Sequence, residues 1–171
     1  MSNIFIKSEQ GTKAAWKGFS SQTTYIAYRL MLLEDDSEFY PERIEDLMLQ
    51  KGNIKTELVQ VKNLSSDLSL SDFSPKESDS FFRRSLSLRD NNSSLVLRIV
   101  SYGNIGTELK GLIEDHEPSK KSIASKLQQY GYTDDEIEWL FNQIVIEKVD
   151  ENDLLSKLYV TRGRVTRGRI Y

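Results

Sequence analysis

Three polar residues, Asp46, Gln60 and Lys62, have the side-chain types needed for chemistry on a phosphate ester. Gln60 and Lys62 lie two positions apart in a stretch where β-branched and long polar residues alternate, so we expect a strand with both side chains on one face. Asp46 falls in the preceding strand-like segment and shares its predicted face with Ile44 and Met48. A carboxylate among apolar neighbours needs a partner, because burying it alone is costly. A metal ion or Lys62 would serve.

This arrangement suits a Mg²⁺ site, with Mn²⁺ as an alternative, because Mg²⁺ prefers hard oxygen ligands and retains several waters. We expect the ligands to be the Asp46 carboxylate, the Gln60 amide oxygen and the main-chain carbonyl of Val61. A bound water would attack a phosphodiester, while Lys62 orients that water and neutralises the growing charge. Glu57 falls on the opposite face by alternation and is a poor ligand candidate. An ordinary strand with two solvated polar residues is the alternative, since short patterns recur by chance.

The composition excludes several other kinds of site. Cysteine is absent, which rules out thiol nucleophiles and Cys-based zinc sites, and His116 is the single histidine, which rules out zinc motifs that need two histidines. His116 lies in a polar, turn-like segment and is predicted to be solvated. Neither a membrane-spanning apolar run nor a signal peptide is present, which favours the cytoplasm. The net charge of −3 does not suggest nucleic-acid binding, although the last residues are basic.

The periodicity of the chain predicts the elements that position Asp46, Gln60 and Lys62. A helix is expected over about 20–34, capped by Ser20 or Ser21, with an apolar stripe that includes Trp16, Phe19 and Leu30. Three strand segments follow at about 39–43, 44–49 and 55–62. A helix opened by Ser74 and Pro75, and a strand over 94–101, complete the series. The order αβββαβ predicts an α/β fold.

The remainder of the chain has a helical texture. Residues 119–130 form an amphipathic pattern, and Thr133 begins a capping box for a second helix. Residues 144–149 suit either a strand or a continuation of that helix, and 153–158 is predicted to be helical. We therefore expect one domain over residues 1–159, with a core at about 11–102 and a C-terminal helical subdomain at about 107–159. Residues 160–171 form a basic tail, read as a linker or a DNA-binding arm.

These motifs resemble the PD-(D/E)xK nuclease superfamily, whose restriction-endonuclease-like core is αβββαβ. The closer resemblance is to double-stranded DNA endonuclease effector domains of bacterial anti-phage systems. These include CD-NTase-associated nucleases with a SAVED sensor domain and related domains on STAND-type NTPases. Gly18–Gln22 is similar to the family's Gly-aromatic-x-x-Gln opening, Glu42–Asp46 to its acidic second strand, and Val59–Asn63 to its Gln-x-Lys strand. The resemblance covers about residues 11–150.

The resemblance implies a role for each matching residue. Asp46 becomes the metal-binding acid, Gln60 takes the place of the more common glutamate, and Lys62 becomes the catalytic lysine. Gln22 matches a polar residue on the first helix that lines the site. Whether Glu42 or Glu45 adds a ligand stays open. The proline of the superfamily name is absent before Asp46.

The implied activity is Mg²⁺-dependent endonuclease cleavage of double-stranded DNA. Such effectors act as homo-oligomers brought together by a sensor or NTPase domain, and no such domain is recognisable in this chain.

Two other functions fit the same sequence. One is a restriction nuclease of the Mrr type, which shares the Gln-x-Lys site and needs a methyl-reading domain. The other is an inactive scaffold of the same fold that binds DNA or a protein partner. Three arginines after the Ser74 segment, Arg83, Arg84 and Arg89, suit either phosphate contacts or a solvated helix face. Trp16 and Trp139 are predicted to be core residues rather than platforms for base stacking.

Overall fold

The computed structural model describes the backbone of residues 2–33, 36–41, 45–91 and 94–165, and the side chains of 12–13, 15–33, 36–41, 45–90 and 94–160. The elements are α1 (Ser2–Met31), β1 (Glu38–Pro41), β2 (Leu47–Lys51), β3 (Ile54–Lys62), η1 (Leu70–Phe73), α2 (Phe81–Leu86), η2 (Arg89–Asn91), β4 (Val96–Ser101), α3 (Thr107–Ile113), α4 (Glu117–Gln129), α5 (Asp134–Gln143), β5 (Ile144–Lys148) and α6 (Glu151–Val165).

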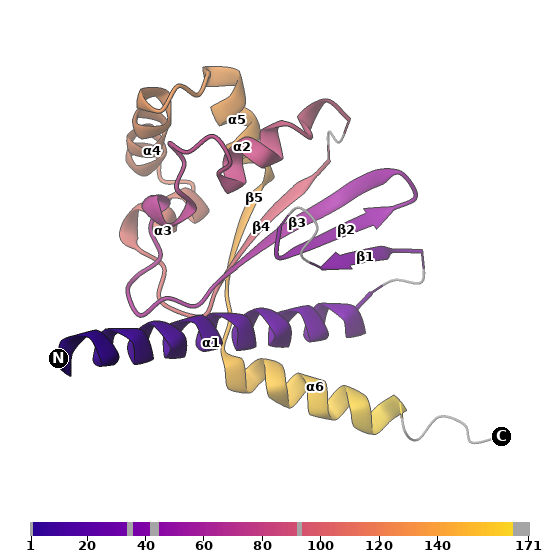
Figure 1. Cartoon of the computed structure of the whole chain (residues 1–171). Helices are drawn as coiled ribbons and strands as arrows, with labels where there is room; N and C mark the ends of the chain where they lie inside the picture. The colour runs from indigo at the N-terminus through magenta and orange to yellow at the C-terminus, as the bar shows by residue number, and fades with distance from the viewer. Residues whose placement is uncertain (1, 34–35, 42–44, 92–93, 166–171) are drawn as a thin grey trace.

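A five-stranded mixed sheet, in the order β1-β2-β3-β4-β5, lies between two layers of helices. The first three strands pair antiparallel, and β3, β4 and β5 pair parallel. Figure 1 shows α1 and α6 on one side of the sheet and α2 to α5 on the other. The predicted α/β class is therefore confirmed, and α1, β1 to β3, α2 and β4 follow in the predicted order.

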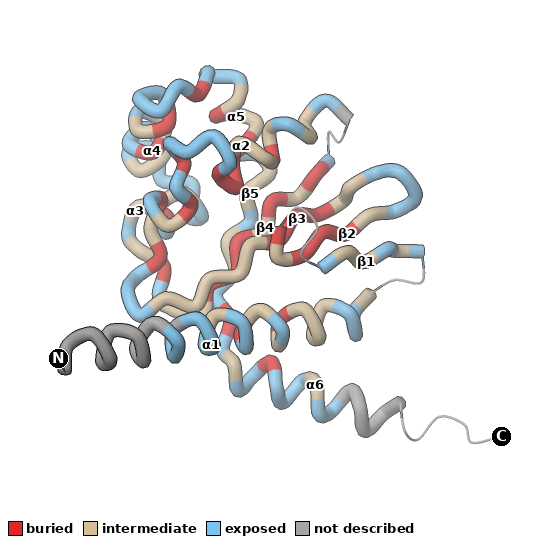
Figure 2. Tube along the Cα trace, viewed as in Figure 1, coloured by how far each residue is buried: buried red, intermediate tan, exposed pale blue. Residues whose placement is uncertain are grey.

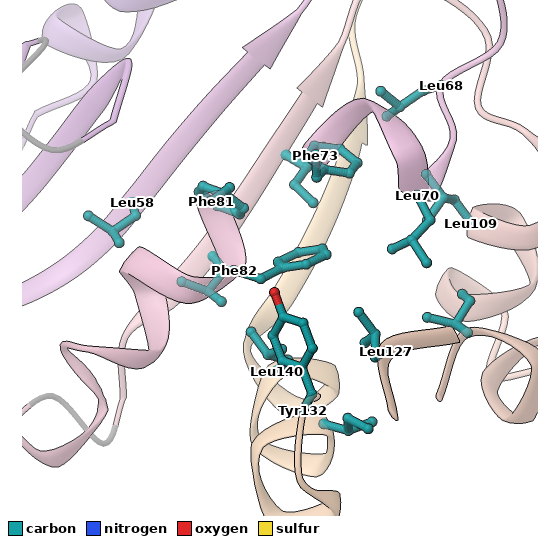
Figure 3. Packing of buried hydrophobic residues seen from close by; sticks show 14 of the residues in the cluster. Leu58, Leu68, Leu70, Phe73, Phe81, Phe82, Leu109, Leu127, Tyr132 and Leu140 are labelled. Carbon is teal, nitrogen blue, oxygen red and sulfur yellow. The ribbon is translucent and has the colours of Figure 1, made fainter. Parts of the chain in front are cut away.

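Each face of the sheet has its own hydrophobic cluster, because successive strand residues point to opposite faces. The larger cluster joins Met48, Leu58 and Ile99 to α2 to α5 and to the aromatic rings of Phe73, Phe81, Phe82 and Tyr132 (Figure 3). The smaller cluster joins Leu47, Val59 and Val100 to Tyr25 of α1 and Leu154 of α6. The central strands are accordingly the most deeply buried part of the chain (Figure 2).

Helix α1 differs from its prediction at the N-terminal end. It begins at Ser2, so neither Ser20 nor Ser21 is its cap; Ser21 is buried and its hydroxyl donates to the Lys17 carbonyl one turn earlier. The predicted apolar stripe is wrong for Trp16, Phe19 and Leu30, which are 68%, 54% and 53% exposed. The N-terminal part of α1 projects past the sheet in Figure 1, and the described contacts of α1 with the smaller cluster begin at Tyr25, which leaves Trp16 and Phe19 in solvent.

The helix after the third strand begins later than predicted. Ser74 has a left-handed backbone (φ 45°) and ends the short η1 helix instead of capping α2. Proline disfavours the helical conformation in the residue before it, which accounts for the break at Ser74. Pro75 is buried and its carbonyl accepts a 2.7 Å hydrogen bond from Tyr132. Helix α2 starts six residues further on, after Ser80, which accepts from the Arg83 N–H.

The C-terminal part is less purely helical than predicted. Thr133 and Glu136 form the predicted capping box of α5. Residues 144–148 are a strand, β5, which extends the sheet beside β4 and settles the alternative left open by the sequence. Helix α6 packs beside α1 and continues to Val165, past residue 159; residues 166–171 of the basic tail lie outside the described chain. None of the described helices has the length and apolar character needed to cross a membrane.

Candidate functional site

The register between β2 and β3 brings Asp46 and Gln60 together. Leu47 pairs with Val59, so the next position outward sets Asp46 opposite Gln60. The Gln60 side-chain Nε2 donates to Asp46 Oδ2 at 2.8 Å, and the main-chain N–H of Val61 donates to the same oxygen at 2.5 Å. Asp46 is half-buried. Its carboxylate is thus fixed to β3 by two hydrogen bonds just before β2 begins.

Alternation along β3 gives Gln60 and Lys62 the same face as the buried Leu58. Lys62 is half-buried, and its ammonium lies 5.8 Å from the centre of the Phe73 ring. This is the face that α2 covers. The predicted separation of Glu57 from Lys62 is confirmed, because Glu57 lies on the α1 face and pairs with Arg29 and Arg98.

Glu45 and Arg84 form an ion pair beside this site that the sequence did not predict. Arg84 Nε and Nη2 donate to the two oxygens of Glu45 at 2.6 and 2.9 Å. The Glu45 side chain is 1% exposed. Burial raises the pKa of Glu45 and the Asp46 carboxylate adds to this effect, whereas Arg84 and Lys62 oppose it. Glu45, Asp46, Lys62 and Arg84 therefore lie close enough to act on one another electrostatically.

The geometry before β2 explains why this pair escaped prediction. Strand alternation starting at residue 44 would point Glu45 away from Asp46. The strand begins only at Leu47, and residues 45 and 46 form a bend. Glu45 can therefore turn toward α2, 39 residues away in sequence. No local periodicity encodes such a contact. Glu42, the other acid of this motif, lies outside the described residues.

Gln22 is half-buried on α1, the helix on the other face of the sheet. Its neighbour Ser21 accepts a hydrogen bond from the Asn63 side chain, directly after Lys62. Tyr102 also donates its hydroxyl to the Ser21 carbonyl at 2.8 Å. These contacts attach α1 to the end of β3. Hydrogen bonds thus join Asp46 to Gln60 and Val61, whereas Gln22 belongs to the helix layer on the opposite face of the sheet.

The donor atoms of this site are compatible with a hard divalent cation. Asp46 offers carboxylate oxygens and Gln60 an amide oxygen, both of the kind that Mg²⁺ accepts. Among the described residues there is no group of three or more histidine, cysteine, aspartate or glutamate side chains that could hold a metal ion. A Mg²⁺ ion at this edge would therefore depend on the amide and main-chain oxygens and on water, as the sequence predicts for Gln60 and Val61.

Arg83 makes its contacts in a different part of the molecule, at Tyr130 and Tyr132. Its guanidinium donates to the Tyr130 carbonyl at 2.8 Å and stacks 3.7 Å from the Tyr132 ring centre. It therefore attaches α2 to the turn before α5. Trp139 packs against the larger hydrophobic cluster, as predicted, whereas Trp16 is exposed.

Comparison with known proteins adds information on the fold. No family model and no curated protein sequence matches the chain. Two solved structures are similar to it. One is a Cap4 SAVED/CARF-domain containing receptor from Acinetobacter baumannii with the cyclic trinucleotide 3'3'3'-cAAA, at a TM-score of 0.58 and 16% identity. The other is a Cap4 SAVED/CARF-domain containing receptor from Moraxella osloensis, at 0.51 and 16%. Each match covers 90% of this chain and 39% of the other, so the chain spans less than half the length of either receptor.

Proposed function

We propose that this chain is a Mg²⁺-dependent endonuclease domain acting on double-stranded DNA, with a PD-(D/E)xK core formed by α1, β1 to β3, α2 and β4. The observation that carries the proposal is the hydrogen-bonded Asp46–Gln60 pair beside Lys62, at the edge of a mixed sheet. Asp at the bend that leads into β2, followed by Gln and Lys on β3, is the order of residues that the resemblance requires.

Each residue has a distinct role in this proposal. Asp46 and the Gln60 amide oxygen bind the metal ion, which when bound supplies charge stabilisation to the phosphate and lowers the pKa of a water. The Val61 N–H holds the Asp46 carboxylate in place at 2.5 Å. Lys62, on the same face as Gln60, binds a phosphate oxygen and stabilises the negative charge that grows there during hydrolysis. Removing the Lys62 side chain should therefore affect turnover more than folding.

The two structural matches support a role in anti-phage defence. The sequence resemblance names nuclease effectors with a SAVED sensor, and both matched proteins are SAVED/CARF-domain containing receptors. We infer that this chain is the effector portion of a similar arrangement, and that a sensor recognising a nucleotide signal assembles several copies to switch on cleavage. Such control keeps an isolated nuclease quiet, because productive contact with DNA then requires more than one copy.

A plasmid-cleavage titration tests this function. Supercoiled plasmid is incubated with increasing concentrations of the chain, with Mg²⁺ or with EDTA. We expect linear and fragmented DNA only with Mg²⁺, and a rate that rises more steeply than in proportion to protein concentration. Cleavage in EDTA would contradict the metal requirement. DNA binding at high concentration with no cleavage would favour the inactive scaffold.

A further inference from the structure

Arg84 occupies a position from which it can serve the same site. Helix α2 packs on the face of the sheet that bears Asp46 and Lys62, through Phe81 and Phe82 in the larger cluster. The Arg84 side chain leaves this helix toward the bend before β2 and ends on Glu45. The Arg84 side chain is 37% exposed, whereas that of Glu45 is 1% exposed. The pair therefore has a buried acidic end and a basic end open to solvent.

The hydrogen bonds hold the Arg84 guanidinium in a fixed orientation. Nε and Nη2 bind the two Glu45 oxygens, and Nη1 donates to the main-chain carbonyl of Asp79. A guanidinium has five N–H donors in one plane. Three of them are used in these bonds to described residues, which leaves one on Nη1 and one on Nη2. Two N–H groups on adjacent nitrogens match the spacing of two phosphate oxygens.

We propose that Arg84 is a DNA-binding residue, held in place by Glu45, that takes the phosphate next to the one attacked at Asp46 and Lys62. The inference rests on the proposed function for its substrate. Arg84 is hydrogen-bonded to Glu45, the residue next to Asp46, and both Asp46 and Lys62 influence this ion pair electrostatically. The positive charges of Arg84 and Lys62 balance the negative charges of Glu45 and Asp46. The site therefore does not repel the negatively charged DNA backbone.

Neighbouring Arg83 provides a matched control. It lies on the same helix and carries the same charge, but its guanidinium is stacked on Tyr132 and bonded to Tyr130. Arg83→Gln and Arg84→Gln therefore change the net charge equally, but only Arg84→Gln removes the cation that pairs with Glu45. The double variant Glu45→Gln/Arg84→Gln keeps the wild-type net charge and leaves no unpaired carboxylate buried at residue 45. It therefore remains informative where Arg84→Gln alone fails to fold.

The test is the affinity for a short fluorescent DNA duplex, measured by anisotropy in EDTA over a series of salt concentrations. Arg84→Gln should weaken binding about tenfold and reduce the salt slope by about one, as loss of one phosphate contact does. Arg83→Gln should bind like wild type, and the double variant should bind more weakly than wild type. Equal affinities for Arg83→Gln and Arg84→Gln, or wild-type binding by the double variant, would overturn the proposal.

Binding in EDTA is independent of cleavage, so the two proposals fail separately. Arg84-dependent binding by a chain that never cuts plasmid would retain Arg84 as a DNA contact and remove the nuclease. Cleavage that proceeds while Arg83→Gln and Arg84→Gln bind DNA equally well would retain the nuclease and remove Arg84 from its DNA surface. Urea unfolding of each variant shows whether a loss of binding comes from loss of the fold.

Discussion

Gln60 of β3 donates a 2.8 Å hydrogen bond to Asp46, which directly precedes β2, although the two residues are 14 positions apart. The same carboxylate oxygen accepts from the Val61 main chain. An amide at residue 60 therefore donates a hydrogen bond to Asp46 through Nε2 and also carries an oxygen of the kind that Mg²⁺ accepts. A glutamate at this position would present a second negative charge to Asp46 and would need the cation to hold the two together.

Gln60→Glu should consequently make folding depend on metal. Without Mg²⁺ the two carboxylates repel each other, and we expect the free energy of unfolding to fall by about 1–3 kcal/mol. Added Mg²⁺ should recover much of this loss, because a ligand that binds only the folded state stabilises it. Thermal melting with Mg²⁺ and with EDTA checks this. A variant whose melting temperature is the same in both would argue against a cation between residues 46 and 60.

Glu57 should be the most costly single acid to remove. It is buried, accepts from Arg29 at 3.0 and 2.6 Å, and also pairs with Arg98. Glu57→Gln leaves two guanidinium groups without their shared anion, so we expect a loss of about 3 kcal/mol in urea unfolding.

The exposed Lys157–Asp153 pair on α6 is the control for Glu57. Asp153→Asn should change stability by less than about 1 kcal/mol. Similar losses for Glu57→Gln and Asp153→Asn would mean that the Glu57 cluster is not a buried network.

Glu108 should make stability depend on pH in the acidic range. Burial acts to raise the pKa of Glu108, but Lys126 and the Leu70 N–H more than offset it, so the pKa lies below its ordinary value of 4.5. Because the pKa of Glu108 is lower in the folded state, the ionised side chain contributes fully to the free energy of unfolding above pH 4.5. This contribution is lost as the pH falls through the lower pKa of the folded state.

Glu108→Gln tests this directly. It should lower the free energy of unfolding by about 1 kcal/mol at pH 7. The difference from wild type should shrink as the pH falls below 4.5. A difference that stays constant down to strongly acidic pH would contradict an ionised Glu108 in this role.

The two tryptophans should differ in their effect on stability. Trp139→Ala removes a ring packed against the larger cluster and should destabilise the fold by about 2–3 kcal/mol. Trp16→Ala removes a ring that is 68% exposed and should change stability by less than about 0.5 kcal/mol. Chemical unfolding followed by circular dichroism measures the change in the free energy of unfolding for both variants. A large loss for Trp16→Ala would place that ring in a contact absent from the isolated chain's structure.

Local patterns predicted the strands of this fold better than its helix boundaries. Alternation along β3 correctly separated Gln60 and Lys62 from Glu57, because the strand is regular from residue 57 to residue 62 and its side chains alternate between the two faces there. The start of α1 was missed because Ser20 and Ser21 suit a helix cap as well as a helix interior. Trp16 was misplaced since nothing in its spacing indicates that α1 projects past the sheet.

Around the candidate site, too, local patterns predicted some residues and missed others. The side-chain types and the spacing of Asp46, Gln60 and Lys62 were enough to single them out. The Glu45–Arg84 pair depends on a bend at residue 45 and on the packing of α2 against the sheet. Local sequence periodicity predicts neither of these features. Strand β5 was left open for a related reason: five residues are too few to distinguish a strand from the end of α5.

Comparing Lys62→Ala with Lys55→Ala in plasmid cleavage tests the central claim most directly. Both lysines lie on β3 and carry the same charge, but Lys55 lies near the start of the strand, where it pairs with Gln50, whereas Lys62 lies at the end of the strand that bears Gln60. The account predicts that, with Mg²⁺ and at concentrations where wild type cuts, Lys62→Ala loses at least about a hundredfold in rate while Lys55→Ala cuts like wild type. Undiminished cleavage by Lys62→Ala would contradict the assignment of this site.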